Sequence, residues 1–368
     1  MPLSLPKIQR PDFQLHSVLQ QHLDNLTKPP RSLGRLEEFA REFGLMRGSM
    51  DLNLRKRVIF TFAADHGISR SGVSAYPREV TAQMVFNFLR GGAAINVLCR
   101  HYGIQSLVVD VGVDYEFPDL PGLVSKKIRR GTENFADRPA MTEEEAIEAI
   151  QVGMACAEGY DLIGTGDMGI GNTTSSSAIL AVLAGLPVED VVGRGTGIDD
   201  QRLRHKTNVV RDALEQREPD PQNALDVLAK IGGLEISAIA GLILGAAARR
   251  IPVVVDGFIS GAGAMIATKL APESRAYLFF SHLSRERGHR RMMEFFDARP
   301  ILDLDMCLGE GTGAAIAIDI ITASVRLYLR AETRGVLLPF PKLSVGIALG
   351  VRLVFENRGN AIEARPFG

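Results

Sequence analysis

Three glycine-rich segments contain residue types that can bind a phosphate and do chemistry beside it. They lie at residues 164–174, 193–200 and 308–313. Glycine lets backbone N–H groups approach a ligand closely, and a turn that opens a helix presents several such donors to an anion. Polar residues are interleaved with these glycines: Asp167, Asn172, Thr173, Thr174, Asp199, Asp200, Glu310 and Thr312. We therefore expect a nucleotide or sugar-phosphate site that also carries out a reaction.

Glu310 stands between two glycines and follows the apolar pair Cys307 and Leu308. A carboxyl group in apolar surroundings has a raised pKa, so Glu310 is a candidate to accept a proton near neutral pH. A single glycine-rich turn is also a common helix cap, and Lys206 taken alone fits a solvated helix. The functional interpretation depends on the three turns occurring together.

Composition excludes several classes of protein. The 368 residues are 46% hydrophobic and 23% charged, which suits one large domain or two moderate ones. The formal net charge of −1 predicts no general attraction to nucleic acid or to an anionic membrane. Three cysteines without a C-x-x-C spacing, and a start without a signal-peptide pattern, indicate the cytoplasm. The longest apolar stretch, residues 236–248, is too short to cross a bilayer.

Apolar strands alternate with helical segments along the chain. Strands are predicted at residues 58–64, 106–113, 161–164, 251–257, 276–280 and 301–304. Their continuous hydrophobicity is typical of a parallel sheet covered on both faces. Helices are predicted at residues 79–102, after a capping box at Thr142 and Glu145, and at residues 201–216 and 233–250. The alternation predicts a doubly wound α/β core.

The two ends of the chain differ from this core. Residues 13–26 and 35–46 are amphipathic, and residues 312–332 form a long apolar helix that precedes a strand candidate at residues 351–355. We predict a small helical domain made of residues 1–49 and 311–368, packed on an α/β domain of residues 50–310. Residues 116–137 are expected to be an exposed excursion whose basic run is a solvated surface.

Polar clusters follow several predicted strands, at the carboxyl ends where open parallel sheets bind ligands. All of them should converge on one crevice. Among them are residue types that can bind a metal: Asp65, His66, Asp256, His282 and His289. Because His282 and His289 are nearly two helical turns apart, a metal-dependent hydrolase is one alternative function. A nucleotide-binding regulator without catalytic activity is another.

The chain resembles the nicotinate-nucleotide:5,6-dimethylbenzimidazole phosphoribosyltransferase family at residues 61–97, 164–180, 193–206, 256–266, 281–289 and 307–319. The resemblance begins near residue 26 and covers nearly the whole chain. It implies a Rossmann-like three-layer α/β/α fold with a mainly parallel sheet, a homodimer, and neither metal nor other cofactor. The implied reaction moves the 5-phosphoribosyl group of nicotinate mononucleotide to 5,6-dimethylbenzimidazole. It yields α-ribazole 5′-phosphate and nicotinate in the nucleotide-loop branch of cobalamin biosynthesis.

The resemblance also implies roles for individual residues. Glu310 is the implied general base, and Asp167, where the family more often has glutamate, is implied to stabilise charge or to hold the ribose hydroxyls. The implied phosphate and ribose contacts are Gly171, Asn172, Thr173, Gly195, Gly197, Lys206 and Ser284. The implied base pocket is lined by Ser74, Tyr76, Pro77, Gln83, Met84 and Leu308, although Met84 fits a core position equally well. An apolar pocket separates rings by about 1–3 kcal/mol per methyl group, so adenine, other benzimidazoles and phenols remain possible acceptors.

Overall fold

Six parallel strands form the central sheet in the computed structural model, which describes residues 3–195, 197–333, 354–357 and 362–365. They follow the order β3-β2-β1-β4-β5-β6. The strands are β1 (Arg57–Ala64), β2 (Gln105–Gly112), β3 (Leu123–Ser125), β4 (Leu162–Met168), β5 (Val253–Val255) and β6 (Leu278–Phe280). The order reverses between β1 and β4, as in a Rossmann fold, and ligands bind outside the strand ends at such a reversal. The predicted α/β fold with a parallel sheet is confirmed.

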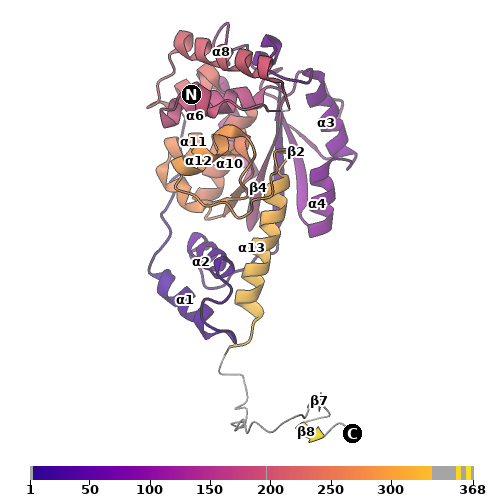
Figure 1. Ribbon diagram of the computed structural model, residues 1–368, viewed down its shortest axis with the longest axis vertical. Helices are drawn as coiled ribbons and strands as arrows, with labels where there is room; N and C mark the ends of the chain where they lie inside the picture. Colours follow the sequence, from indigo (N-terminus) through magenta and orange to yellow (C-terminus); the bar gives the residue numbers. More distant parts are fainter. Residues whose placement is uncertain (1–2, 196, 334–353, 358–361, 366–368) are drawn as a thin grey trace.

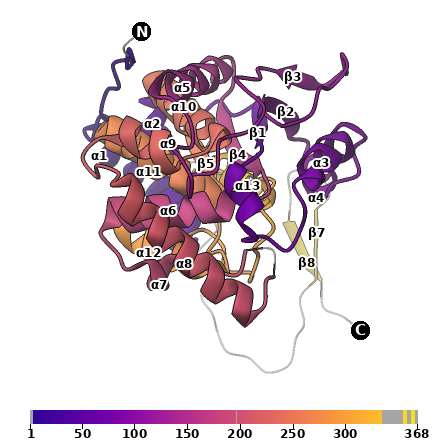
Figure 2. The same ribbon diagram turned by 90° about the horizontal axis from the view of Figure 1, so that it is seen from above.

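Helices cover both faces of the sheet (Figures 1 and 2). One side carries α5 (Glu143–Cys156), α6 (Asn172–Ala184), α7 (Val188–Val191), α8 (Asp200–Arg217), α9 (Ala224–Ile231), α10 (Leu234–Ala248), α11 (Phe258–Leu270) and α12 (Arg287–Phe295). The other carries α3 (Glu79–Leu89), α4 (Ala94–Tyr102) and α13 (Thr312–Arg330). Short 3₁₀ turns, η1 (Gly67–Ser71) and η2 (Pro272–Tyr277), complete this part of the chain.

Strand β1 is apolar at all but two of its positions, Arg57 and Thr61. Val58, Phe60 and Phe62 are buried in the core on one face of the sheet. Ile59 and Ala63, which alternate with them, are buried in the core on the other face. Since successive side chains of a strand point to opposite faces, a strand covered on both sides is apolar at most positions. The exception inside the sheet is Thr61, whose hydroxyl donates to the Glu310 carbonyl.

The N-terminal helices α1 (Leu15–Asn25) and α2 (Arg35–Arg47) lie beside one end of α13 (Figure 1). Helix α13 also packs on β1, β4 and β5, so it belongs both to this helical group and to the layer that covers the sheet. The predicted boundaries near residues 49 and 311 stay a prediction. A hairpin of β7 (Val354–Asn357) and β8 (Ile362–Arg365) follows, and residues 351–353 of the predicted strand lie outside the described residues.

Helix α13 is long and apolar enough to cross a membrane by length and composition. However, 61% of its most apolar window is buried inside the protein. Burial of this kind is what a core helix of a globular protein shows, because its apolar side chains contact the sheet and neighbouring helices.

Three predictions about individual elements are wrong. The single helix expected at residues 79–102 is two helices, because Gly91 adopts φ +75° between α3 and α4. The strand expected at residues 301–304 is reduced to one bridge between Leu302 and His282. The excursion at residues 116–137 contains β3, and Lys127 is paired at 2.7 Å with the buried Asp110 instead of being solvated.

Candidate active site

A pocket of about 350 Å³ lies beyond the carboxyl ends of β1, β4 and β5. Residues from all three glycine-rich segments contribute to its wall. The lining residues are Tyr76, Val80, Met84, Asp167, Met168, Gly169, Ile170, Asn172, Thr173, Gly195, Gly257, Phe258, Ile259, His282, Ser284, Glu286, Cys307, Leu308, Gly309 and Glu310. The expected convergence of polar clusters on one crevice is observed for the three glycine-rich segments and for residues 282–286, but not for Asp65, which lines a different pocket.

Glu310 is held on a tight loop in which residues 309, 310 and 311 all have positive φ, +82°, +64° and +97°. Its carbonyl accepts a hydrogen bond from Thr61 Oγ1 at 3.0 Å, and its carboxylate Oε2 accepts one from Ile95 N at 3.4 Å. A Cβ at Gly166 would lie 2.4 Å from the carbonyl oxygen of Glu310, so β4 leaves room for this loop only because it has a glycine there. Positive φ at a non-glycine residue is uncommon and costs energy, as often found at functional sites.

Burial raises the pKa of Glu310, and the nearby Asp256 carboxylate raises it further. The direction agrees with the sequence prediction, but the cause differs. Leu308 is 58% exposed, and Cys307 is exposed as well. The carboxyl group is buried instead at the start of α4, where the Ile95 N–H lowers its pKa in part. Its pKa is thus raised toward the range in which a carboxylate can take up a proton.

Asp167 ends β4 and lies in the same pocket as Glu310. Its Oδ2 accepts a hydrogen bond from Asn172 Nδ2 at 2.9 Å, and a Cβ at Gly309 would be 3.3 Å from this oxygen. The pKa of Asp167 is well above its usual range because the side chain is fully buried and because Asp256, Glu235 and Glu310 are negatively charged neighbours. A positive charge that develops on a bound ribose would favour ionisation of such a group.

Asp256 lies near the carboxyl groups of Asp167 and Glu310 and is hydrogen-bonded to the start of α13. Its Oδ1 accepts from Ala314 N at 2.9 Å and its Oδ2 from Gly311 N at 3.2 Å. Backbone N–H groups at a helix N-terminus favour a negative charge. The bonds fix the loop that carries Glu310, so Asp256 positions the loop while burial raises its own pKa.

The opposite wall of the pocket is formed by the start of α6 and by the turn at residues 193–195. Thr173 and Gly195 line the pocket, and Lys206 lies behind them on α8, with 1% of its surface exposed. Its Nζ donates to Thr173 Oγ1 at 2.9 Å and to Gly193 O at 3.2 Å. Burial lowers the pKa of Lys206 to about 8. A helix N-terminus with a buried cation beside it is a suitable place for a phosphate.

Not all predicted site residues reach the pocket. Asp167, Asn172, Thr173, Gly195, Ser284, Tyr76, Met84, Leu308 and Glu310 line it. Within the described part of the chain, its wall does not include Ser74, Pro77, Gln83, Gly171, Gly197 or Lys206. Gln83 lines a separate pocket of about 230 Å³ with Asp65, Arg78, Phe86 and Asp114. The Oγ of Ser74 accepts a hydrogen bond from Tyr76 N at 3.3 Å, which places Ser74 beside a lining residue.

Two polar side chains of the pocket were not assigned a role in the transferase site from the sequence, Glu286 and His282. Both belong to residues 281–289, a segment that the sequence did mark as a polar cluster. Nothing in the pattern distinguishes Glu286 from its neighbours Arg285 and Arg287, which are exposed. Only the path of the chain after β6 turns the Glu286 side chain into the pocket.

Two of the three histidines proposed as metal ligands, His66 and His289, are hydrogen-bonded to other groups, and His282 lines the pocket. His66 pairs with Glu235 at 2.5 Å through Nε2 and with Ser175 Oγ at 3.0 Å through Nδ1. His289 Nδ1 accepts from Ser284 N at 2.8 Å, and burial lowers the pKa of His289 to about 3. Across residues 3–195 and 197–333, no group of three or more His, Cys, Asp or Glu side chains is arranged to hold a metal ion. The geometry gives the hydrolase alternative no support.

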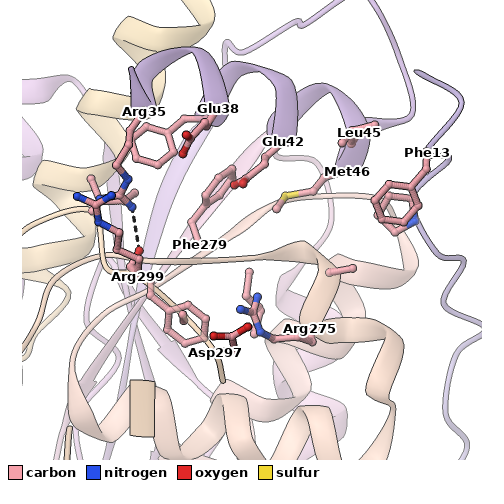
Figure 3. Close-up of a pocket in the computed structure, with 17 residues that line it drawn as sticks. Phe13, Arg35, Glu38, Glu42, Leu45, Met46, Arg275, Phe279, Asp297 and Arg299 are labelled. Atoms are coloured by element: carbon pink, nitrogen blue, oxygen red, sulfur yellow. Dashed lines mark hydrogen bonds between the residues drawn. The ribbon is translucent and has the colours of Figure 1, made fainter. Parts of the chain in front are cut away.

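A second pocket of about 350 Å³ lies between α2 and the edge strand β6 (Figure 3). Arg35 reaches from α2 to the carbonyls of Pro300 and Arg299, each at 2.8 Å. Arg275 donates to Phe296 O at 3.0 Å. Arg35 and Arg275 thus bind neighbouring backbone, and none of the three glycine-rich segments borders this pocket. It links the N-terminal helix to the sheet and shares no residue with the first pocket.

Known proteins are similar to this chain over most of its length. The profile of a family described as phosphoribosyltransferase matches residues 8–335. A nicotinate-nucleotide–dimethylbenzimidazole phosphoribosyltransferase of Geobacter sulfurreducens is 56% identical over 335 residues, which are 90% of this chain and 95% of the relative. One of the same name from Geobacter sp. strain M21 is 57% identical over 335 residues, 90% and 96% of the two chains. A crystal structure of CobT from Thermus thermophilus superposes with a TM-score of 0.83 at 48% identity, covering 87% and 97%.

Proposed function

The chain belongs to the phosphoribosyltransferase family, in which similar proteins are named nicotinate-nucleotide–dimethylbenzimidazole phosphoribosyltransferase. We propose that it transfers the phosphoribosyl group of nicotinate mononucleotide to 5,6-dimethylbenzimidazole and releases nicotinate. One observation carries the proposal. Glu310, with its raised pKa, and the Thr173–Gly195 wall with Lys206 behind it lie in one pocket. The pocket thus offers a proton acceptor and a phosphate site to the two substrates at once.

The reaction needs one bond to form and one to break at C1′ of the ribose. A benzimidazole nitrogen attacks C1′, the bond from C1′ to the nicotinate nitrogen breaks, and nicotinate leaves as a neutral ring bearing its carboxylate. No acid is required for this leaving group. The second nitrogen of the imidazole ring loses its proton, and we assign Glu310 as the group that accepts this proton. The product is α-ribazole 5′-phosphate.

Asp167 is the group that we place against the ribose. Positive charge spreads over the ribose ring in the transition state, and a fixed carboxylate stabilises such charge. Asn172 donates to Asp167 and keeps its oxygen oriented. The phosphate is assigned to the start of α6 and the 193–195 turn, where Thr173, Gly195 and Ser284 line the pocket.

The acceptor ring is assigned to the wall formed by Tyr76, Met84 and Leu308. This wall is apolar and open, since Tyr76 is 54% exposed and Leu308 is 58% exposed. Apolar walls distinguish poorly between rings of similar size. Adenine, other benzimidazoles and phenols are therefore included among the acceptors to be tested.

We further propose a homodimer located in the cytoplasm. The exposed apolar side chains Tyr76 and Leu308 at the pocket, and Phe13 on the N-terminal segment, support an association that covers them. Three free thiols, Cys99, Cys156 and Cys307, are consistent with a reducing compartment. Light scattering coupled to size-exclusion chromatography measures the mass of the assembly directly.

The decisive experiment incubates purified protein with nicotinate mononucleotide and 5,6-dimethylbenzimidazole. Chromatography with mass spectrometry follows nicotinate and α-ribazole 5′-phosphate. Formation of both in equal amounts is the expected result, and omission of the acceptor is the control. Release of nicotinate without a riboside would indicate hydrolysis, and absence of both products with every acceptor would refute the proposal.

A further inference from the structure

Glu286 is a carboxylate on the phosphate side of the pocket that the proposed reaction does not use. It precedes α12 and lines the pocket together with Thr173, Gly195 and Ser284. Its backbone N–H donates to Ser284 Oγ at 3.2 Å, which fixes the segment that carries it. A negative side chain beside a phosphate site requires an explanation, because two like charges at short range repel.

The Glu286 side chain lies against the 193–195 turn. Its Oε2 is buried without a hydrogen-bond partner among the described residues, and a Cβ at Gly193 would be 2.3 Å from it. Burial raises the pKa of Glu286, while the Lys206 ammonium and the backbone N–H of Gly195 lower it. The carboxylate therefore already interacts with the cation and the amide that a phosphate would need.

Lys206 depends on this carboxylate in turn. Burial lowers the pKa of Lys206, and the charge of Glu286 is what counteracts it. The two hydrogen bonds of Lys206 go to Thr173 and to Gly193, which leaves Glu286 to act through its charge. The charge of Glu286 thus favours the ammonium form of Lys206, which an anionic ligand requires.

We propose that Glu286 is an internal competitor of the substrate phosphate: its carboxylate lies against the 193–195 turn when no phosphate is bound, and phosphate binding displaces it. This inference rests on the proposed function. It makes Glu286 a specificity-determining residue: a dianion with several acceptor oxygens displaces the carboxylate, whereas a single carboxylate ligand gains nothing by replacing another. Neutral ribosides would leave Glu286 in place.

The test measures sulfate binding by calorimetry and the KM for nicotinate mononucleotide, with wild type, Glu286→Gln and Glu294→Gln. Glu294 is a matched control on the same segment, exposed and paired with Arg291 at 2.9 Å. At about pH 6.5, below the pKa of Lys206 of about 8, we expect Glu286→Gln to lower the sulfate Kd about tenfold or more. The KM for the nucleotide should fall with it, and Glu294→Gln should match wild type.

The pH dependence provides a second readout that a purely structural role would not produce. Sulfate keeps its charge over the range tested. As pH falls through the raised pKa of Glu286, protonation removes the competing charge, so wild type should bind sulfate more tightly and Glu286→Gln should lack this rise. The other charged groups near Glu286 or in its pocket are Lys206, Arg285, Arg287, Arg194, His282, Asp167 and Glu310, and all are present in both proteins.

Weaker or unchanged sulfate binding by folded Glu286→Gln, with wild type active, would overturn the inference and make Glu286 a ligand-holding group instead. Should the variant misfold, a wild-type sulfate affinity that does not rise toward acid pH would overturn it equally. If wild type releases no nicotinate, the proposed function fails first, and the inference fails with it.

Discussion

Replacing Glu310 with glutamine removes the proposed proton acceptor while leaving its surroundings in place. The side-chain oxygen of glutamine can still accept the bond from Ile95 N, and the backbone carbonyl keeps its bond from Thr61. Glutamine also tolerates the local backbone about as well as glutamate, since the strain at φ +64° belongs to any residue with a Cβ. The substitution therefore tests chemistry with little change in structure.

The expected loss is that of a general base. Such groups contribute about 10²- to 10⁴-fold in rate, or about 3–5.5 kcal/mol at about 1.4 kcal/mol per factor of ten. Nucleotide binding should persist, because the phosphate side of the pocket is formed by other residues. Wild-type kcat should rise with pH as the Glu310 carboxyl group, whose pKa burial raises, loses its proton. The variant should lose this rise.

The contribution of Glu310 to the free energy of unfolding should fall with rising pH, whereas kcat should rise. Because the pKa of Glu310 is higher in the folded protein than in the unfolded chain, the stability that it contributes is present at low pH. It is lost as pH rises through the folded-state value. Glutamine does not titrate, so Glu310→Gln should be at least as stable as wild type above that value.

The assay measures kcat and KM by nicotinate release, and urea unfolding at about pH 8 measures stability. Glu294→Gln serves as the control. A turnover within threefold of wild type would remove Glu310 from the chemistry. A loss of turnover accompanied by an equal loss of nucleotide binding would show that the residue acts through structure.

Three further predictions concern other parts of the pocket. Lys206→Met should raise the KM for nicotinate mononucleotide about tenfold or more, since a hydrogen bond to a charged group contributes about 1.5–3 kcal/mol. The KM of the wild-type enzyme should rise above about pH 8, because Lys206 loses its proton there. Gly166→Ala should lower kcat and reduce the free energy of unfolding by about 1–3 kcal/mol, because its Cβ would lie 2.4 Å from the Glu310 carbonyl oxygen; a wild-type urea midpoint would contradict this. N-ethylmaleimide should modify Cys307, which is exposed and lines the pocket, and should inactivate the enzyme, while bound substrate should protect it. Cys99 and Cys156 should react more slowly, because burial raises their pKa values to about 12 and about 11. Peptide mapping identifies the modified thiol.

Predictions based on neighbouring residues were the ones that held. The capping box of Thr142 and Glu145 starts α5, with both reciprocal hydrogen bonds present. Strand β1 could be predicted from its apolar run, because burial on both faces favours apolar residues at successive positions. The pKa direction of Glu310 also followed from the sequence, although its carboxylate is buried beside the start of α4 and Leu308 is exposed.

The helix expected at residues 79–102 failed at a local feature, the positive φ of Gly91, whereas other features of the structure depended on contacts between distant segments. Lys127 looked solvated within a basic run, but the folded chain brings Asp110 to 2.7 Å from its Nζ. The pair Gln83 and Met84 is a sharper case: adjacent residues on α3 line two different pockets, because a helix turns about 100° per residue. Only the orientation of α3 on the sheet determines which of them reaches the active site.

The sequence alone determined the class of fold, the glycine-rich turns and the reactive side chains, because periodicity and turn chemistry act between residues that are close in the chain. Tertiary structure alone decided which of these side chains share a pocket. Glu286, Asp167 and Glu310 meet there only because the strand order reverses between β1 and β4 and brings the loops after separate strands to one edge. Strand order depends on how whole layers pack, so it cannot be predicted from the pattern of neighbouring residues.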